Sequence, residues 1–291
     1  MPAYSRIAAV TGGNKGIGLA CVRQLALQYP QSSFNSGPFL IYLTARSKER
    51  GEKAVQDMLG DPQLQKAKAL RKDGGLSDVE FLPLDIDSQD SIKNFAAHLK
   101  KEHPEGIDML INNAGIAMDG FSADVVKKTL HCNYYGTMEA TKQLLPHIRD
   151  GGRVVNVASM AGMIDSRYSD PIRKRFLSAT KTEQITELME EFTSAVEKNS
   201  YEGTWPGAAY KVSKAGVVGM TKTLAMDNTS TGSKVLINSC CPGYVETDMT
   251  KGRGRLSADQ GARTPVLCAL GDIKGSNGEF WRNEEISPWE R

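Results

Sequence analysis

Short apolar runs alternate with amphipathic segments along the whole chain, and this alternation is the feature that most limits how it can fold. Buried strands of a parallel sheet are apolar throughout, whereas the helices that connect them carry one apolar face. The expected strands are residues 6–11, 40–45, 79–85, 107–114, 153–159 and 235–242, with a seventh near 278–281. The sequence therefore predicts an α/β protein with one doubly wound parallel sheet of about seven strands, built as a single domain over residues 1–291.

One segment, residues 163–207, interrupts this alternation because it carries no strand signal. Pro171 suits the first position of a helix, and Thr180 and Glu183 have the spacing of a capping box at the start of a second one. Apolar residues then recur at helical spacing, at Ile185, Leu188, Met189, Phe192 and Val196. We expect a helical insertion that packs one apolar face on the main domain.

A glycine-rich loop, TGGNKGIG at residues 11–18, lies between the first expected strand and an amphipathic segment. Its important glycines are Gly12, Gly16 and Gly18, in the spacing G-x-x-x-G-x-G. A strand, a glycine turn and a helix in this order direct free backbone N–H groups and the positive helix end at an anion. The loop predicts a cradle for the pyrophosphate of a dinucleotide, and a plain surface turn is the alternative.

The end of the second expected strand indicates which dinucleotide fits. An acidic residue there hydrogen-bonds the adenosine ribose of NAD, whereas an arginine accommodates the 2′-phosphate of NADP. The strand ends in LTARS, which puts Arg46 at this position, and Lys15 in the glycine loop is a second cation that could reach the same phosphate. The two cations favour NADPH. Asp85, which closes the third strand, either bonds the adenine amino group or caps the following helix.

Polar residues gather where the later strands end. Tyr210 and Lys214 are four residues apart near the start of a helix, so they share one face. Ser159 closes the fifth strand, the sequence NNAG at residues 112–115 closes the fourth, and Asn133 lies in the helix between them. Because open α/β sheets bind ligands outside the carboxyl ends of their strands, we expect these residues to converge beside the glycine loop.

The order of these motifs resembles that of the short-chain dehydrogenase/reductase family, and in particular its carbonyl reductases with an extended loop before the tyrosine. The similarity covers almost the whole chain and rests on TGGNKGIG, LDI at Asp85, NNAG, Asn133, VVNVAS ending in Ser159, YKVSK, and CCPGYVETDM at residues 240–249. Ser159 and Tyr210 are 51 residues apart, and the helical insertion accounts for this long spacing. The resemblance implies a Rossmann-like fold and an enzyme that uses NADPH to reduce aldehydes, ketones or quinones.

The resemblance also implies a role for each site residue. Tyr210 would donate a proton to the carbonyl oxygen, Ser159 would polarise that oxygen, and Lys214 would lower the pKa of the phenol and bond the nicotinamide ribose. Asn133 would hold a water that relays protons to Lys214. Cofactor contacts are expected from Gly12, Asn14, Lys15, Gly16, Ile17, Gly18, Arg46, Asp85, Ile86, Asn113, Ala114, Gly115, Tyr210, Lys214, Pro242, Gly243, Val245 and Thr247.

Two segments are expected to wall the substrate pocket, namely the loop TKGRGRLS at residues 250–257 and the tail at residues 277–291. Met249, Trp281 and Trp289 are the candidates for contact with an apolar substrate. A tail of this composition carries no motif that identifies the substrate.

Composition bears on the remaining functional classes. A formal net charge of +2 argues against nucleic acid as a partner, and the four histidines form no H-E-x-x-H motif, so no metal site is expected. The five cysteines form no C-x-x-C, which favours reduced thiols, with Cys241 as a buried structural residue. Without a leader or an apolar stretch long enough to span a bilayer, the sequence predicts a cytoplasmic protein that does not enter membranes.

Two other functions and one question of assembly stay open at this level. The first alternative is a dehydrogenase of the same fold that works in the oxidative direction on an alcohol or steroid. The second is a regulator that binds NADP(H) without turnover. Many members of the family form dimers through the helices that carry Asn133 and the Tyr210–Lys214 pair, and an insertion covering that face favours a monomer.

Overall fold

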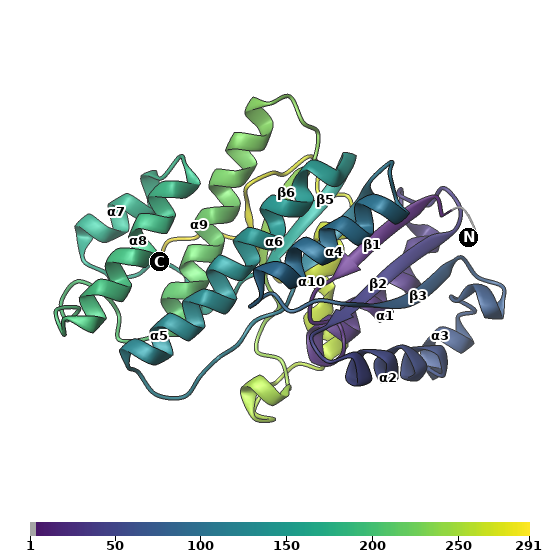
Figure 1. Ribbon diagram of the computed structural model, residues 1–291, viewed down its shortest axis with the longest axis horizontal. Coiled ribbons are helices and arrows are strands. Elements are labelled where there is room, and N and C mark those ends of the chain that lie inside the picture. The colour runs from purple at the N-terminus through teal and green to yellow at the C-terminus, as the bar shows by residue number, and fades with distance from the viewer. Residues whose placement is uncertain (1–3) are drawn as a thin grey trace.

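The computed structural model describes residues 4–291 and contains an eight-stranded sheet in the order β3-β2-β1-β4-β5-β6-β7-β8 (Figure 1). Neighbouring strands are parallel except for β7 and β8. The strands are β1 (Arg6–Val10), β2 (Phe39–Ala45), β3 (Ser77–Pro83), β4 (Ile107–Asn112), β5 (Ile148–Val157), β6 (Leu236–Cys241), β7 (Phe280–Arg282) and β8 (Glu285–Ile286). The order changes direction between β1 and β4, and such a switch point is where open α/β sheets bind ligands.

The predicted α/β fold is confirmed, and two strands differ most from the prediction, whereas the bounds of the others shift by at most two residues. β5 begins at Ile148, five residues before the predicted start, because Asp150, Gly151 and Gly152 give its first half no apolar signal. β8 was not predicted at all, since its two residues are both exposed and carry no alternating pattern. The parallel part of the sheet therefore has the seven expected strands, and the antiparallel β8 extends its edge.

Helices cover both faces of the sheet, which explains why a strand such as β2 is buried along its whole length. One face carries α1 (Gly16–Gln28), α2 (Lys48–Leu59), α3 (Pro62–Lys66) and α10 (Ala258–Leu270). The other carries α4 (Gln89–Glu102), α5 (Ala123–Leu130), α6 (Thr137–Leu144) and α9 (Ala209–Ser230). Side chains of β1 alternate between the two cores, because Ile7 and Ala9 join one and Ala8 and Val10 the other.

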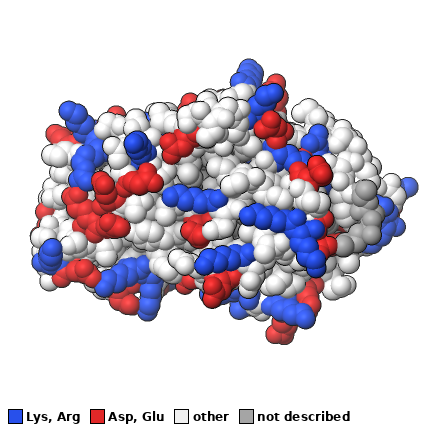
Figure 2. Space-filling model, turned by 45° about the horizontal axis from the view of Figure 1, so that its top comes forward, with Lys and Arg blue, Asp and Glu red and all other residues white. Residues whose placement is uncertain are grey.

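The insertion forms two helices, α7 (Asp170–Ser178) and α8 (Thr182–Glu197), at one end of the molecule (Figure 1). The predicted apolar face of α8 is buried, from Ile185 to Val196, and it packs against α9 and α5. The polar face stays in solvent: acidic side chains gather at the left end of Figure 2, where α7 and α8 lie.

The predicted start of α8 was wrong, as was the exact place of Pro171. The helix begins at Thr182, and the side-chain oxygen of Gln184 accepts hydrogen bonds from the backbone N–H groups of Thr180 and Lys181. The capping box of Thr180 and Glu183 therefore does not form, because the helix begins one residue later than this spacing requires, with Lys181 as its N-cap. Pro171 is the second residue of α7, after Asp170.

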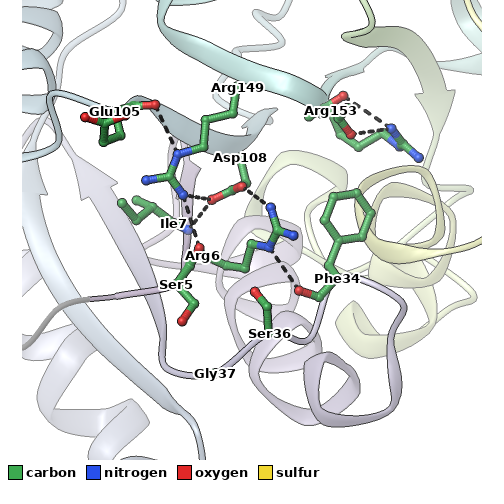
Figure 3. Close-up of polar contacts among 12 residues, drawn as sticks. Ser5, Arg6, Ile7, Phe34, Ser36, Gly37, Glu105, Asp108, Arg149 and Arg153 are labelled. Carbon is green, nitrogen blue, oxygen red and sulfur yellow. Dashed lines mark hydrogen bonds and ion pairs between the residues drawn. The ribbon is translucent and has the colours of Figure 1, made fainter.

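The amino ends of the central strands are joined by a buried carboxylate, Asp108 at the start of β4 (Figure 3). Its side chain is 1% exposed and accepts hydrogen bonds from Arg6 Nη1 at 2.7 Å, from the backbone N–H of Ile7 at 2.8 Å and from Arg149 Nη1 at 3.0 Å. Arg149 also donates to the backbone oxygens of Ser5 and Glu105. This network links β1, β4 and β5 at the end of the sheet opposite the glycine loop.

Candidate active site

The glycine loop between β1 and α1 has a conformation that requires glycine at three places. Gly12 and Gly16 have φ angles of +63° and +54°, in the left-handed region. A Cβ atom on Gly18 would lie 2.3 Å from the carbonyl oxygen of Gly12. Lys15, at the N-cap of α1, provides no side-chain cap, whereas serines cap α2, α4, α5 and α10. The first N–H groups of α1 thus point toward the loop without a side-chain partner, as an anion site requires.

The loop after β4 is fastened to the glycine loop by Thr11. Its hydroxyl oxygen accepts hydrogen bonds from the backbone N–H groups of Asn113 and Ala114, at 3.0 and 2.9 Å. The Asn113 amide in turn donates to the carbonyl oxygens of Thr11 and Gly12. The Asn113 side chain is therefore engaged within the protein, and its predicted cofactor contact stays a prediction. Thr11 was not predicted, although a hydroxyl residue directly before the glycines was visible in the sequence.

The two cations expected near a 2′-phosphate are both exposed. Arg46 directly follows β2 and, within residues 4–291, has no ion-pair partner. Lys15 forms an ion pair with Asp248, with Nζ 2.5 Å from Oδ2 and the two side chains 62% and 78% exposed. Exposed pairs of this kind add little to the stability of a protein, so Lys15 can exchange this partner for a stronger anion.

Asp85 lies half-buried after β3, and its Oδ1 accepts a hydrogen bond from the backbone N–H of Asp87 at 3.1 Å. The cap of α4 is Ser88, whose hydroxyl oxygen accepts from the N–H of Ser91. Asp85 thus shapes the turn before the helix, and its contact with an adenine amino group stays a prediction. The next residue, Ile86, is buried.

Ser159, Tyr210 and Lys214 come together at the carboxyl end of β5. Ser159 follows the strand by two residues, and its hydroxyl oxygen accepts a hydrogen bond from the N–H of Ala161 at 3.1 Å. Burial raises the pKa of Tyr210 to about 12, and a hydrogen bond with the Ser159 side chain acts against this rise. Burial lowers the pKa of Lys214 to about 8. The Lys214 ammonium lies 5.8 Å from the centre of the Tyr210 ring and donates to the carbonyl oxygen of Val157 at 2.7 Å.

Asn133 is buried in a π-helical turn, η3 (His131–Gly136), between α5 and α6. Its side chain accepts a hydrogen bond from the N–H of Ile116 and donates to the carbonyl oxygen of the same residue, both at 2.8 Å. A Cβ atom on Gly115 would lie 3.0 Å from Asn133 Oδ1 and 3.6 Å from Lys214 Nζ. Short π-helical turns are frequent at functional sites, and here one places Asn133 close to Gly115, which is also close to Lys214.

The segment after β6 folds back over the glycine loop. Gly243 has a φ of +88°, and Val245 is buried and pairs with Leu256. A Cβ atom on Gly16 would lie 3.4 Å from the methyl carbon of Thr247, so the two segments are in contact. Pro242, Asn14 and Ile17 are half-buried at this contact region.

The cysteine beside this segment, Cys241, is buried as predicted. Its sulfur accepts hydrogen bonds from the backbone N–H groups of Met160 and Gly243, at 3.2 and 3.3 Å. Within residues 4–291, no group of three or more His, Cys, Asp or Glu side chains is placed to hold a metal ion.

The prediction that Trp281 contacts an apolar substrate was wrong. It lies in β7 beside Cys240 and is buried in the core under α1 and α10, because the alternation of this short strand turns it to that face. Trp289 is partly buried, and its indole N–H donates to the carbonyl oxygen of Gly162 at 2.9 Å. Met249 is 45% exposed and stays a candidate.

Comparison with known proteins is consistent with this geometry. Residues 6–169 and 192–256 match the model of the short chain dehydrogenase family, and the gap between them holds α7 and the start of α8. The chain is 37% identical to carbonyl reductase 1 (NADPH) of Mus musculus, over 97% of this chain and 98% of the relative. It is 36% identical to carbonyl reductase 3 (NADPH) of Rattus norvegicus, over 99% of this chain and all of the relative.

Solved structures share the fold of the chain. Salutaridine reductase from Papaver somniferum aligns with a TM-score of 0.80 and 26% identity, over 95% of this chain and 99% of that chain. An NADPH-bound carbonyl reductase from chicken fatty liver has the same fold, with a TM-score of 0.67 and 19% identity over 98% and 95% of the two chains. With a family match over most of its length and relatives above 30% identity along nearly all of it, the chain belongs to the short-chain dehydrogenase family.

Proposed function

We propose that the protein is an oxidoreductase that uses NADPH to reduce carbonyl compounds, namely aldehydes, ketones or quinones, to alcohols or hydroquinones. The observation that carries this proposal is the meeting of Ser159, Tyr210 and Lys214 at the carboxyl end of β5. The relatives at 36–37% identity over nearly the whole chain are NADPH carbonyl reductases, which supports the same reaction.

The residues of the glycine loop fit a dinucleotide. Gly12 and Gly16 have left-handed backbones, and the start of α1 lacks a side-chain cap, so backbone N–H groups are available for the pyrophosphate. Arg46 and Lys15 would hold the 2′-phosphate, which selects NADPH over NADH. When bound, NADPH supplies the hydride that reduces the carbonyl carbon.

The side chains of the site would manage the proton. The Ser159 hydroxyl oxygen accepts from Ala161, and its proton, which bonds Tyr210 in the free protein, would bond the substrate oxygen and polarise the carbonyl. Tyr210, with a pKa of about 12 in the free protein, is protonated at neutral pH and donates to that oxygen. Lys214, with a pKa of about 8, is mostly charged at pH 7 and stabilises the phenolate that Tyr210 leaves.

Asn133 would keep the proton supply in place. Because its side chain bonds both backbone groups of Ile116, it fixes the loop after β4 against η3. Glycine at position 115 leaves room between Asn133 Oδ1 and Lys214 Nζ, and a water there would relay protons from solvent to Lys214.

The test is the oxidation of NADPH at 340 nm with an o-quinone or an aromatic aldehyde. We expect turnover with NADPH, much slower turnover with NADH, and a loss of at least about 10³-fold in kcat for Tyr210→Phe with cofactor binding retained, because only the phenol can protonate the oxygen. Tyr29→Phe is the matched control, since within residues 4–291 the hydroxyl of Tyr29 bonds only the backbone N–H of Ser36 and the backbone oxygen of Gly37.

Two alternatives have their own outcomes in this experiment. Oxidation of alcohols or steroids with NADP⁺, without carbonyl reduction, would identify a dehydrogenase that works in the oxidative direction. Tight NADPH binding without turnover in either direction would identify a regulator that senses NADP(H). Either result overturns the proposed reduction.

We propose that the protein is a monomer. Helix α8 of the insertion packs on α5 and on α9, the helix that carries Tyr210 and Lys214. Many family members form dimers through the helices that carry Asn133 and this pair, and here α8 would cover that surface. Sedimentation equilibrium is expected to give the chain mass of 31.7 kDa, and a mass of twice that value would contradict the proposal.

We place the protein in the cytoplasm. All five cysteines are free and buried, which suits a reducing compartment. None of the described helices is both long and apolar enough to cross a membrane.

A further inference from the structure

Lys211, the residue after Tyr210, is a buried lysine that the proposed mechanism does not use. It is 4% exposed. Its ammonium donates to the carbonyl oxygen of Met163 at 2.6 Å, to Asp165 Oδ2 at 3.0 Å and to the carbonyl oxygen of Ala161 at 3.2 Å. A buried ammonium is tolerated only when its hydrogen bonds are made, so these three acceptors fix its place.

All three acceptors belong to residues 159–165, which we call the serine segment because it begins with Ser159. The N–H of Ala161 donates to the Ser159 hydroxyl oxygen at 3.1 Å, and the N–H of Gly162 donates to the Ser159 carbonyl oxygen at 2.9 Å. Ala161 thus bonds Lys211 through its carbonyl group and orients Ser159 through its N–H group. Ala161 therefore connects the side chain of Lys211 to the side chain of Ser159.

The serine segment has little freedom to move in other directions. A Cβ atom on Gly162 would lie 2.5 Å from the backbone carbonyl carbon of Lys214, so the segment is in close contact with α9. Beyond it lies the end of the chain: Trp289 donates to Gly162 through its indole, and Ile164 exchanges backbone hydrogen bonds with Trp289 and Arg291. Lys211 is the charged contact on the side of α9.

We propose that Lys211 is a positioning residue for the reaction, whose ammonium holds the serine segment against α9 so that the Ser159 and Tyr210 hydroxyls act on the same oxygen. This inference rests on the roles of Ser159 and Tyr210 in the proposed function. Misplacing a reacting group by about 1 Å can slow catalysis by on the order of 10²-fold. Because Trp289 still holds the segment from the other side, we expect a loss of about tenfold when Lys211 is removed.

The test is a double-mutant cycle between Lys211→Met and Ser159→Ala. We expect Lys211→Met to lower kcat about tenfold, with the KM for the carbonyl substrate and the Kd for NADPH changed less than twofold. In the Ser159→Ala background the same substitution is expected to change kcat less than twofold, because it has no serine left to misplace. A purely structural role would lower kcat by the same factor in both backgrounds.

The matched control is Lys222→Met. Lys222 lies on the same helix and donates to the carbonyl oxygen of Leu177. It therefore also ties α9 to another segment, but Leu177 lies outside the serine segment. Its loss is expected to lower the melting temperature and to change kcat less than twofold. An equal loss of kcat in both lysine variants would overturn the proposal.

The remaining outcomes separate this proposal from the proposed function. An unchanged kcat in Lys211→Met, or an equal loss with and without Ser159, overturns the positioning role. An unchanged kcat in Ser159→Ala overturns the proposed function instead. If Lys211→Met does not fold, Asp165→Asn replaces it, since two of the three acceptors remain. It is expected to lower kcat two- to threefold, only while Ser159 is present, and any other result overturns the proposal.

Discussion

Two buried charges, at opposite ends of the central strands, differ in how completely the protein satisfies them. Asp108, at the amino end, accepts three hydrogen bonds from Arg6, Ile7 and Arg149. Lys214, near the carboxyl end of β5, can donate three hydrogen bonds, but within the described chain it has one acceptor, the carbonyl oxygen of Val157. The hydrogen bonds of Asp108 are therefore complete without a ligand, whereas those of Lys214 are not.

This difference in hydrogen bonding indicates that Asp108 is a stabilising charge and Lys214 a functional one. Burial lowers the pKa of Lys214 from 10.5 to about 8, which corresponds to about 3 kcal/mol against folding at pH 7. The free N–H groups of Lys214 are those that the proposed mechanism directs to the nicotinamide ribose and the water. Active sites commonly keep such unsatisfied groups at the expense of stability.

The largest effect on stability is expected for Asp108→Ala. Removing the carboxylate leaves two guanidinium groups and the N–H of Ile7 without their acceptor, so urea denaturation should show a loss of about 3 to 5 kcal/mol. At temperatures where the variant is folded, its kcat should stay within twofold of wild type, because the network lies at the opposite end of the sheet. A loss below about 1 kcal/mol would mean that water satisfies Arg6 and Arg149, and the comparison would fail.

A smaller effect of opposite sign is expected for Lys214→Met. The variant removes the unfavourable burial of an ammonium but leaves Val157 without its donor, so the unfolding free energy should rise by about 1 to 2 kcal/mol at pH 7. The kcat for carbonyl reduction should fall at least about 10²-fold. A less stable variant would show that Lys214 is a structural charge like Asp108.

The pH dependence sharpens the same prediction. Because the pKa of Lys214 in the folded protein, about 8, is lower than the unfolded value of 10.5, the unfolded state binds more protons between these values. The stability advantage of Lys214→Met is therefore greatest below pH 8 and should shrink by about 1 kcal/mol between pH 7 and pH 9. Wild-type kcat for reduction should also decrease above pH 8, as the ammonium is lost. A constant advantage across this range would contradict the assigned cause.

The fold could be predicted because its strands are continuous apolar runs, as in β2, and because the connecting helices carry one apolar face. The proposed catalytic residues could be chosen because Ser159 lies at a strand end and Tyr210 and Lys214 share a helix face. Both signals are local, so they survive without knowledge of the tertiary structure.

Other features depend on partners far away in the sequence. Lys211 reads as an ordinary surface lysine until residues 161–165 fold around its ammonium. Trp281 could face either a pocket or a core, and only the pairing of β7 with β6 decides. The ion pair of Lys15 with Asp248 joins residues that are 233 positions apart, and no local pattern indicates such a contact.

The contact between Ile164 and the last residues of the chain affects how the protein is made. Ile164 exchanges backbone hydrogen bonds with Trp289 and Arg291, which come much later in the chain. During synthesis, the amino-terminal part of a chain folds first. The sheet from β1 to β6 can therefore assemble before residues 289–291 are made, and until then the serine segment lacks its second support. A nascent chain can thus reach its fold before its active site is complete, and residues 289–291 complete the site.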